Sequence, residues 1–285
     1  MTSSTQKPDK IAVVIRVFSR ISDANALIRI IQKNWKCIDK EIFVLHNGES
    51  SGFPASDLMK SCGHYVNVTF NSGHRTGARD LVQTAVKVLA GYSEFTHYLF
   101  IESDCWVLND KTIVDALRGM KKFKKPCASY IWVAKRRSYA VDFFIVESRY
   151  AHSHPALFTW DAHPERYFSK VAQYDTFIFN DMGIVHAPSM LKRCKISPLI
   201  LSNGRFRIFP NASALTHHLE EMGCKSNEEA LTLKKSLANA LSGVELFPNV
   251  PVIKFPKDLI WKKISKYIPQ SSWFHFWIYL PKKWF

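Results

Sequence analysis

The chain has 285 residues, of which 47% are hydrophobic and 13% aromatic, so it is long and apolar enough to bury a large core. Its 39 lysines and arginines against 24 aspartates and glutamates give a net charge of +15, which predicts an anionic partner such as nucleotide phosphates, lipid or nucleic acid. Six scattered cysteines without a CxxC pair exclude a cysteine zinc site and a small disulfide scaffold.

The first residues, 1–9, are polar and lack the apolar core of a signal peptide, and no apolar run reaches the length of a membrane span. We therefore expect a flexible tail at residues 1–9 and a cytoplasmic protein. Reduced thiols are the state expected for its cysteines in that compartment.

Apolar runs then alternate with amphipathic stretches. Continuous apolar runs predict buried strands at 10–18, 41–45, 65–70 and 98–101. Helical periodicity predicts helices at 24–35, 77–89 and 111–120, with Ser22 or Asp23 capping the first. This β-α-β alternation predicts an α/β fold with a mostly parallel sheet flanked by helices.

The second half is less regular. Apolar runs predict strands at 129–133 and 142–147, and periodicity predicts a helix at 227–241. The stretch 151–168 is rich in histidine, proline and aromatic residues and is predicted to be a long loop. Its rings have two interpretations, stacking on an acceptor sugar or ordinary packing, and the sequence leaves both open.

Two acids follow the strand predicted at 98–101. Glu102 and Asp104 are separated only by Ser103, so on extended chain both carboxylates point to the same side. Ligands of open α/β sheets bind outside the carboxyl ends of the strands. Two oxygen donors at such an end suit Mg²⁺ or Mn²⁺ carrying a diphosphate, while a solvated acidic turn is the simpler alternative.

Other nucleotide-binding motifs are missing from the sequence. Neither G-x-G-x-x-G after the first strand nor G-x-x-x-x-G-K-[ST] occurs, which argues against a dinucleotide dehydrogenase and a P-loop NTPase. The order of features over residues 10–120 instead resembles the GT-A type of nucleotide-sugar glycosyltransferase, family-2-like members included. The matching segments are the turn 17–20, His46-Asn47-Gly48, the loop and helix start 71–79, and Phe100–Asp104 in the place of Asp-x-Asp.

This resemblance implies a GT-A-like (Rossmann-like) fold. Residues 10–125 would form the nucleotide-sugar-binding half, residues 126–245 the acceptor-binding half of the same domain, and residues 246–285 a C-terminal basic and aromatic appendage. The donor nucleoside-diphosphate sugar and its diphosphate would be bound by residues at the strand ends and in the following loops: Ser19, Asn47, Arg75, Arg79, Glu102, Ser103 and Asp104.

The resemblance also implies a divalent cation, Mn²⁺ or Mg²⁺, bound by Asp104. Glu102 departs from the first aspartate of the family pattern, so its contact with the metal stays open. His186 resembles the late histidine that completes the metal shell in some GT-A families, and His217 and His218 are weaker candidates. Such an ion neutralises the departing diphosphate as a Lewis acid.

Arginines provide a second source of positive charge for phosphate. Arg75 and Arg79 lie at the predicted start of a helix, where guanidinium forks and the helix N-terminus favour anions. The alternative for both is a solvated helix face, paired with Asp80 or another acid. Arg16 lies inside a buried-looking strand, so it either meets an internal carboxylate or points into the cleft.

An inverting transferase needs a carboxylate that deprotonates the acceptor hydroxyl, whereas a retaining enzyme does not need one in this role. Asp181 is the preferred catalytic base because it closes an apolar run, as Asp104 does, and Asp175 is the second candidate. Other acids remain as rivals: Asp142, Glu147 and Asp161.

The C-terminal segment, residues 246–285, ends in lysines interleaved with Trp261, Trp273, Trp277 and Trp284. Tryptophan favours the headgroup zone and lysine favours anionic lipid, which predicts peripheral attachment to the inner face of the cell membrane. The alternative is a segment that docks on its own domain with its lysines reaching into solvent.

The sequence therefore predicts a glycosyltransferase acting on a glycan or lipid-linked acceptor at the cytoplasmic membrane face, in surface polysaccharide synthesis. A metal-dependent nucleotidyltransferase is the enzymatic alternative, although residues 17–23 contain no glycine for its basic loop. A basic nucleic-acid-binding protein is the other alternative. It is disfavoured because no recognised module is present, so we expect no nucleic-acid partner.

Overall fold

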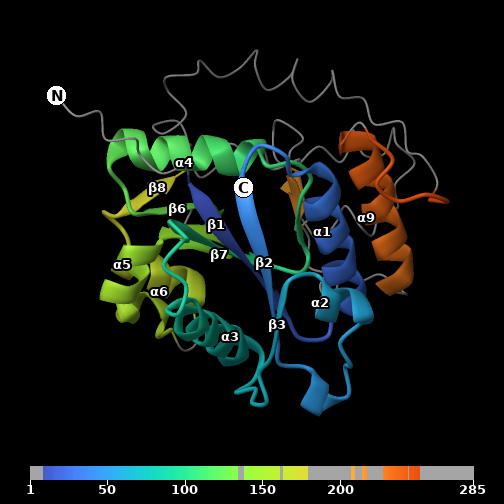
Figure 1. Ribbon diagram of the computed structural model, residues 1–285, viewed down its shortest axis with the longest axis horizontal. Coiled ribbons are helices and arrows are strands. Elements are labelled where there is room, and N and C mark those ends of the chain that lie inside the picture. The colour runs from blue at the N-terminus through green and yellow to red at the C-terminus, as the bar shows by residue number, and fades with distance from the viewer. Residues whose placement is uncertain are drawn as a thin grey trace, which may run out of the picture.

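The computed structural model describes residues 9–133, 138–160, 163–178, 207–208, 214–216, 227–242 and 244–250. Its centre is a seven-stranded sheet with the strand order β3-β2-β1-β4-β7-β6-β8 (Figure 1). The strands are β1 (Lys10–Val17), β2 (Asp39–His46), β3 (His64–Asn67), β4 (His97–Glu102), β6 (Cys127–Val133), β7 (Ser138–Glu147) and β8 (Thr176–Ile178).

Four neighbouring strands, β3, β2, β1 and β4, run parallel. β7 is antiparallel to β4, and β6 is antiparallel to β7 and so returns to the direction of β4, with β8 parallel to it. One strand therefore opposes the others. This confirms the predicted α/β fold with a mostly parallel, GT-A-like sheet.

Helices cover both faces of the sheet, as Figure 1 shows. α1 and α4 pack on one face, and α3, α5 and α6 on the other, so the two faces have separate cores. The helices are α1 (Ile21–Asn34), α2 (Asp57–Ser61), α3 (His74–Leu89), α4 (Lys111–Phe123), α5 (Ser148–Ser153), α6 (Pro164–Val171) and α9 (Asn227–Ser242), with 3-10 turns η1 (Glu49–Ser51) and η3 (Pro155–Phe158).

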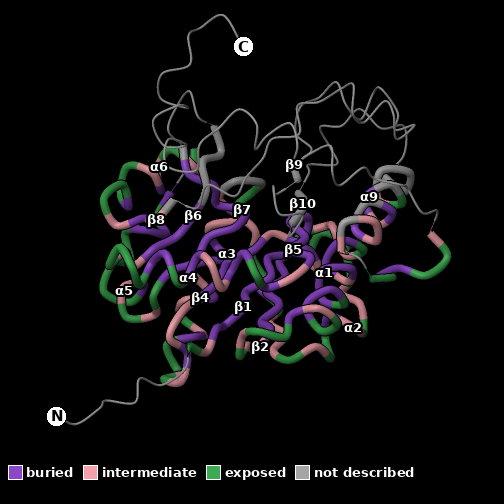
Figure 2. Tube along the Cα trace, turned by 90° about the horizontal axis from the view of Figure 1, so that it is seen from above, coloured by how far each residue is buried: buried purple, intermediate pink, exposed green. Residues whose placement is uncertain are grey.

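The alternation of side chains along β1 explains this arrangement. Ile11, Val13 and Ile15 enter the core beneath α1, whereas Ala12 and Val14 enter the core beneath α3. In Figure 2, β1 and the neighbouring strands of the large sheet are mostly buried and cross the middle of the molecule. A strand buried on both faces reads as an unbroken apolar run, which is why the sequence revealed it.

A second, three-stranded sheet follows the acidic motif directly. Its strands β5 (Cys105–Val107), β10 (Ala214–Thr216) and β9 (Arg207–Ile208) are antiparallel. The buried Trp106 indole donates to the Ser103 carbonyl at 3.1 Å. Trp35 directly follows α1, and its indole donates to the Val107 carbonyl at 2.8 Å. The chain that leaves Asp104 is therefore fixed on both sides.

Two expectations about local structure are wrong. α1 begins at Ile21, and neither Ser22 nor Asp23 caps it, because Asp23 lies inside the first turn, with its carboxylate engaged elsewhere. Residues 151–168 contain helical segments in place of a long loop. Their rings Phe158, Trp160 and Phe168 are buried in the core beneath α3, so these three belong to packing.

All four described cysteines, Cys37, Cys62, Cys105 and Cys127, carry free thiols. In the part of the chain that the structure describes, no helix combines the length and the apolar character needed to cross a bilayer.

Candidate functional site

Polar side chains gather where the parallel strands β1, β2 and β4 end. Glu102 is the last residue of β4 and lies beside Arg16 of β1 in the sheet register. The Arg16 guanidinium donates to Glu102 Oε1 at 3.2 Å and to the carbonyl of Val141 on β7. The Arg16 side chain is 2% exposed and that of Glu102 29%, so the pair runs from the interior to the surface.

Arg16 thus meets an internal carboxylate, the first of the two alternatives that the sequence offered. Its Nε and Nη1 atoms are buried and have no hydrogen-bond partner among the described residues. Burying a guanidinium with only some of its N–H donors bonded costs free energy. The ion pair with Glu102 therefore contributes much of the stabilisation of the buried Arg16 charge.

Asp104 is the second acid of the motif and is buried. Arg20, the residue directly before α1, donates from Nη1 to Asp104 Oδ2 at 2.5 Å. The two side chains are 13% and 4% exposed, so water screens this ion pair weakly. Ser103, between the two acids, is buried, and its amide donates to the Arg16 carbonyl at 3.3 Å.

A buried lysine completes the surroundings of Asp104. Lys234 of α9 donates to the Asp104 carbonyl at 2.5 Å and to Asp23 Oδ1 of α1 at 2.9 Å. Its ammonium also lies 4.1 Å from the centre of the Trp106 ring, a cation–π contact. Burial lowers the pKa of Lys234, and Asp23 and Asp104 oppose that shift.

The end of β2 forms a second polar group. Asn47 is buried; its amide nitrogen donates to the Gly77 carbonyl of α3 at 3.2 Å, and its Oδ1 has no partner among the described residues. A Cβ on Gly77 would lie 2.1 Å from Asn71 Oδ1, so a larger residue at position 77 would require the Asn71 side chain to move. Asn47 therefore joins the strand end to the start of α3.

His46 links the ends of β1 and β3. Its Nε2 lies 2.9 Å from the Phe18 carbonyl and its Nδ1 lies 3.1 Å from the Tyr65 hydroxyl, which donates to Glu49 at 2.9 Å. Burial lowers the pKa of His46, and the hydrogen bond from Tyr65 lowers the pKa of Glu49. Asn67 also donates to Glu49, at 2.5 Å, so this network fixes the loop after β2.

The other residues predicted to bind the donor sugar nucleotide lie at different places in the fold. Ser19 is half-buried in the turn between β1 and α1, close in sequence to Arg20. Arg79 of α3 donates to Asp80 Oδ1 and to the Trp160 carbonyl, both at 3.3 Å, which agrees with the alternative of pairing with Asp80. Arg75 lies in the first turn of α3, and its side chain is outside the described part.

Of the two candidate bases, only Asp175 lies in the described part of the chain. Asp175 precedes β8; its carbonyl accepts from the Cys127 amide at the start of β6, and its Oδ2 accepts from Tyr150 at 2.5 Å. That end of the sheet is the one where β4 begins, opposite to Glu102, so Asp175 is not part of this site. Asp181, His186, Asp161, His217 and His218 lie outside the described residues.

Of the rival bases, Glu147 ends β7 opposite His97 and so lies at the distant edge of the sheet. Asp142 is buried on β7, one residue beyond the pair of Phe143 with Ile101, and therefore lies near Glu102. Its charge helps to raise the pKa of the Cys105 thiol, although burial is the main cause of that shift.

A divalent metal would compete with two arginines for these acids. Arg20 engages Asp104 Oδ2 and Arg16 engages Glu102 Oε1. No three His, Cys, Asp or Glu side chains of the described ranges form a group that holds a metal ion. Metal ligation by Asp104 and His186 stays a prediction, because His186 lies beyond these ranges.

The sequence analysis missed the roles of Arg20, Asp23 and Lys234. A signal for Lys234 existed: it follows Leu231 by three residues and precedes Ala238 by four, so a charge stands in the apolar stripe of α9. A charge in such a stripe either reaches solvent or finds a buried partner. The partner came from residues far away in the sequence, which periodicity does not reveal.

No family model matches the chain, and no curated protein matches it. Solved structures similar to it include S. aureus TarS 1–349 in complex with UDP-GlcNAc, with 12% identity, a TM-score of 0.43, and 60% of this chain and 56% of that one covered. The glycosyltransferase GlyE of Streptococcus pneumoniae TIGR4 has 11% identity and a TM-score of 0.42 over 61% of this chain and 46% of its own.

A 4-diphosphocytidyl-2C-methyl-D-erythritol synthase from Anaerococcus prevotii DSM 20548 has 10% identity and a TM-score of 0.42 over 60% of this chain and 86% of its own. The chain spans less than two thirds of the TarS and GlyE structures. A structure described as that of a glycosyltransferase, GlyE, is thus among those that this chain resembles.

Proposed function

We propose that the chain is a glycosyltransferase that uses a nucleoside-diphosphate sugar as its donor. The observation that carries the proposal is the pair of acids Glu102 and Asp104 at the carboxyl end of the central parallel strand β4, each held by an arginine. Charged groups fixed at this edge of an α/β sheet lie where such sheets bind ligands.

The proposed chemistry assigns separate tasks to these groups. Transfer of the sugar leaves negative charge on the departing diphosphate, and cations that are already oriented stabilise that charge best. Glu102 is the more exposed acid, and its carboxylate is suited to accept hydrogen bonds from sugar hydroxyls. Asp181 remains our proposed base for an inverting reaction, because Asp175 lies at the other edge of the sheet.

Nucleotide binding tests this function. The unfolding temperature of the purified chain should rise with one or more nucleoside diphosphates or their sugars, since a ligand at a hundred times its Kd stabilises by about 2.7 kcal/mol. The shift should disappear in Asp104→Ala and persist in the matched variant Asp115→Ala, an acid on α4 that pairs with Arg118.

The absence of a shift with every nucleotide would contradict the proposal for a folded protein. Release of pyrophosphate from a nucleoside triphosphate, without sugar transfer, would instead support the nucleotidyltransferase alternative.

We also propose an acceptor and a cellular location for the reaction. A glycan or lipid-linked acceptor at the cytoplasmic face of the membrane, in surface polysaccharide synthesis, agrees with the lysine-rich and tryptophan-rich composition of the C-terminal end. The end of that segment, residues 251–285, lies outside the described part of the chain.

A further inference from the structure

We infer that Arg20 binds the diphosphate of the donor and that donor binding requires no divalent metal ion. This inference rests on the proposed function and deepens it, because it assigns the group that carries the positive charge. It departs from the metal that the acidic motif suggests in the sequence.

Asp104 is already bound by a cation. Arg20 Nη1 lies 2.5 Å from Asp104 Oδ2, and the Asp104 side chain is only 4% exposed. A metal ion ligated by this oxygen has to displace a guanidinium from a buried, charge-assisted hydrogen bond. Arg20 therefore already offsets the charge at this oxygen, and a metal ion at Oδ2 would compete with it.

The charges next to Asp104 are paired as well. Arg16 holds Glu102 at 3.2 Å, and Lys234 holds Asp23 at 2.9 Å while it donates to the Asp104 carbonyl. The charges of these acids are thus neutralised by Arg16 and Lys234. Among the described residues, no three aspartate, glutamate, histidine or cysteine side chains form a group that could hold a metal ion.

The shape of arginine suits both a carboxylate and a diphosphate. A guanidinium is a planar fork of five donors, so one side can bind a carboxylate while another binds phosphate oxygens in a two-point contact. Asp104 fixes Arg20 at the point where β1 passes into α1, at the same sheet edge as Glu102. A cation held in place this way binds a diphosphate without a further ordering cost.

The test measures the affinity of the full chain for the nucleoside diphosphate that stabilises it, by calorimetric titration in excess EDTA and in Mn²⁺. We expect the two affinities to agree within about threefold. Arg20→Met should weaken binding about 10- to 100-fold, the range of a lost hydrogen bond to a charged group. Arg20→Lys should also weaken it, because the charge remains while the fork is lost.

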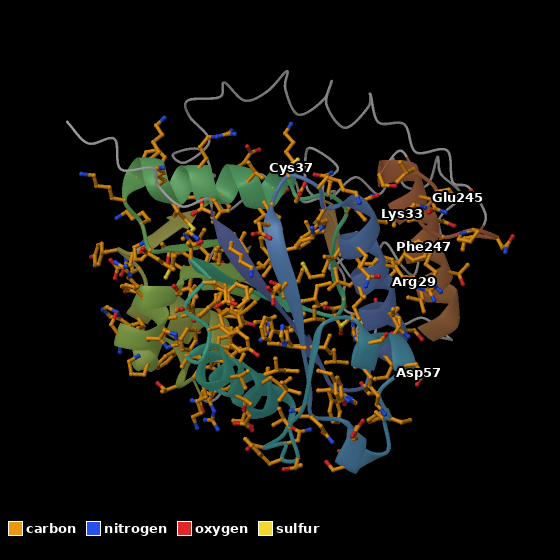
Figure 3. All side chains as sticks on the ribbon, in the orientation of Figure 1. Arg29, Lys33, Cys37, Asp57, Glu245 and Phe247 are labelled. Atoms are coloured by element: carbon orange, nitrogen blue, oxygen red, sulfur yellow. The ribbon has the colours of Figure 1, made fainter. Side chains whose placement is uncertain are left out.

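Arg29→Met is the matched control. Arg29 lies on the same helix and is exposed (labelled in Figure 3), so its loss should leave the affinity unchanged. A spectrum of the backbone in the far ultraviolet checks that each variant is folded. Should Arg20→Met unfold, Arg20→Lys provides the comparison.

Two results would overturn the inference and leave the proposed function intact. One is binding that EDTA abolishes and Mn²⁺ restores, and the other is wild-type affinity in both folded Arg20 variants. Failure of every nucleotide to bind the wild-type chain, with and without metal, would overturn the function and this inference together.

Discussion

Single buried charges explain much of the candidate site. Lys234 is fully buried and is stabilised by the Asp23 carboxylate, the Asp104 carbonyl and the Trp106 ring. Removing one partner of such a pair leaves the other charge buried alone, which costs more than the pair itself is worth. Lys234 is therefore a positioning residue that orients Asp104 from a distant helix.

The substitution Lys234→Met should lower the free energy of unfolding by about 3–5 kcal/mol, because Asp23 then remains buried without its cation. Urea unfolding measures the change. The double variant Lys234→Met with Asp23→Leu should regain part of the loss, since both charges are then absent. Lys235→Met, at the adjacent and less buried lysine, is the control and should change stability by less than about 1 kcal/mol.

A second prediction for a single residue concerns His46. Burial lowers its pKa below the value of 6.5 that the unfolded chain has, so the unfolded state binds a proton more readily than the folded state. The stability from neutral His46 is fully present above pH 6.5 and is lost as the pH falls through the lowered pKa of the folded state. Each unit of difference between the two pKa values corresponds to about 1.4 kcal/mol.

Urea unfolding between pH 8 and pH 5 tests this in the wild type and in His46→Gln. The variant should be less stable at pH 8, because it cannot reproduce both contacts of the ring with Phe18 and Tyr65. The difference in unfolding free energy between wild type and His46→Gln should narrow as the pH falls. A difference that stays constant with pH would contradict the assigned direction of the pKa shift.

At the scale of elements, the contact of α4 with β8 gives a test of close packing. A Cβ on Gly119 would lie 2.1 Å from the ring of Phe177, and that ring is stacked on Phe123 with their centroids 5.4 Å apart. Helix propensity alone favours alanine over glycine by about 1 kcal/mol. The overlap should outweigh this gain, since forcing extra atoms into a packed site costs about 1–3 kcal/mol.

Gly119→Ala should therefore destabilise the protein, as measured by thermal unfolding. Truncation of the ring in Gly119→Ala with Phe177→Leu should remove most of the penalty that the methyl group adds. Gly91→Ala serves as the control, because its Cβ meets the Val88 carbonyl at an ordinary contact distance of 3.6 Å. A stabilised Gly119→Ala would show that Phe177 moves freely.

The elements also show what sequence patterns reveal and what they miss. β1 and β4 were predictable because both faces of each strand are buried, so their apolar runs are unbroken. The start of α1 was not, because Asp23 looks like a cap and in fact serves Lys234 from α9. Helix-start signals are local, and this partner is 211 residues away.

In the candidate site, too, some positions were predictable from local sequence and others depended on tertiary contacts. The place of Glu102 and Asp104 was predictable because they lie directly at the end of a buried strand, and ligands of open α/β sheets bind outside the carboxyl ends of the strands. The position of Asp175 was not, because the order and direction of β8 in the sheet decide at which edge it lies, and both depend on tertiary pairing with β6.

At the scale of the whole molecule, the net charge of +15 and the C-terminal segment predict binding to membranes. The full chain should sediment with vesicles that contain anionic lipid and remain in solution with neutral vesicles. A chain that ends at Val250 should lose most of this binding, since each lysine near an anionic surface contributes about 1 kcal/mol. Equal binding of both proteins would assign the attraction to the folded part.

The long separation between Asp23 and Lys234 has a consequence for biosynthesis. A ribosome adds about 5–20 residues per second, so Lys234, which is 211 positions after Asp23, is added roughly 10–40 s later. During that interval β1, β4 and α1 can assemble while Asp23 still lacks its ammonium partner. A chain that terminates before Lys234 keeps a buried carboxylate without its cation and should therefore be less stable than the full chain.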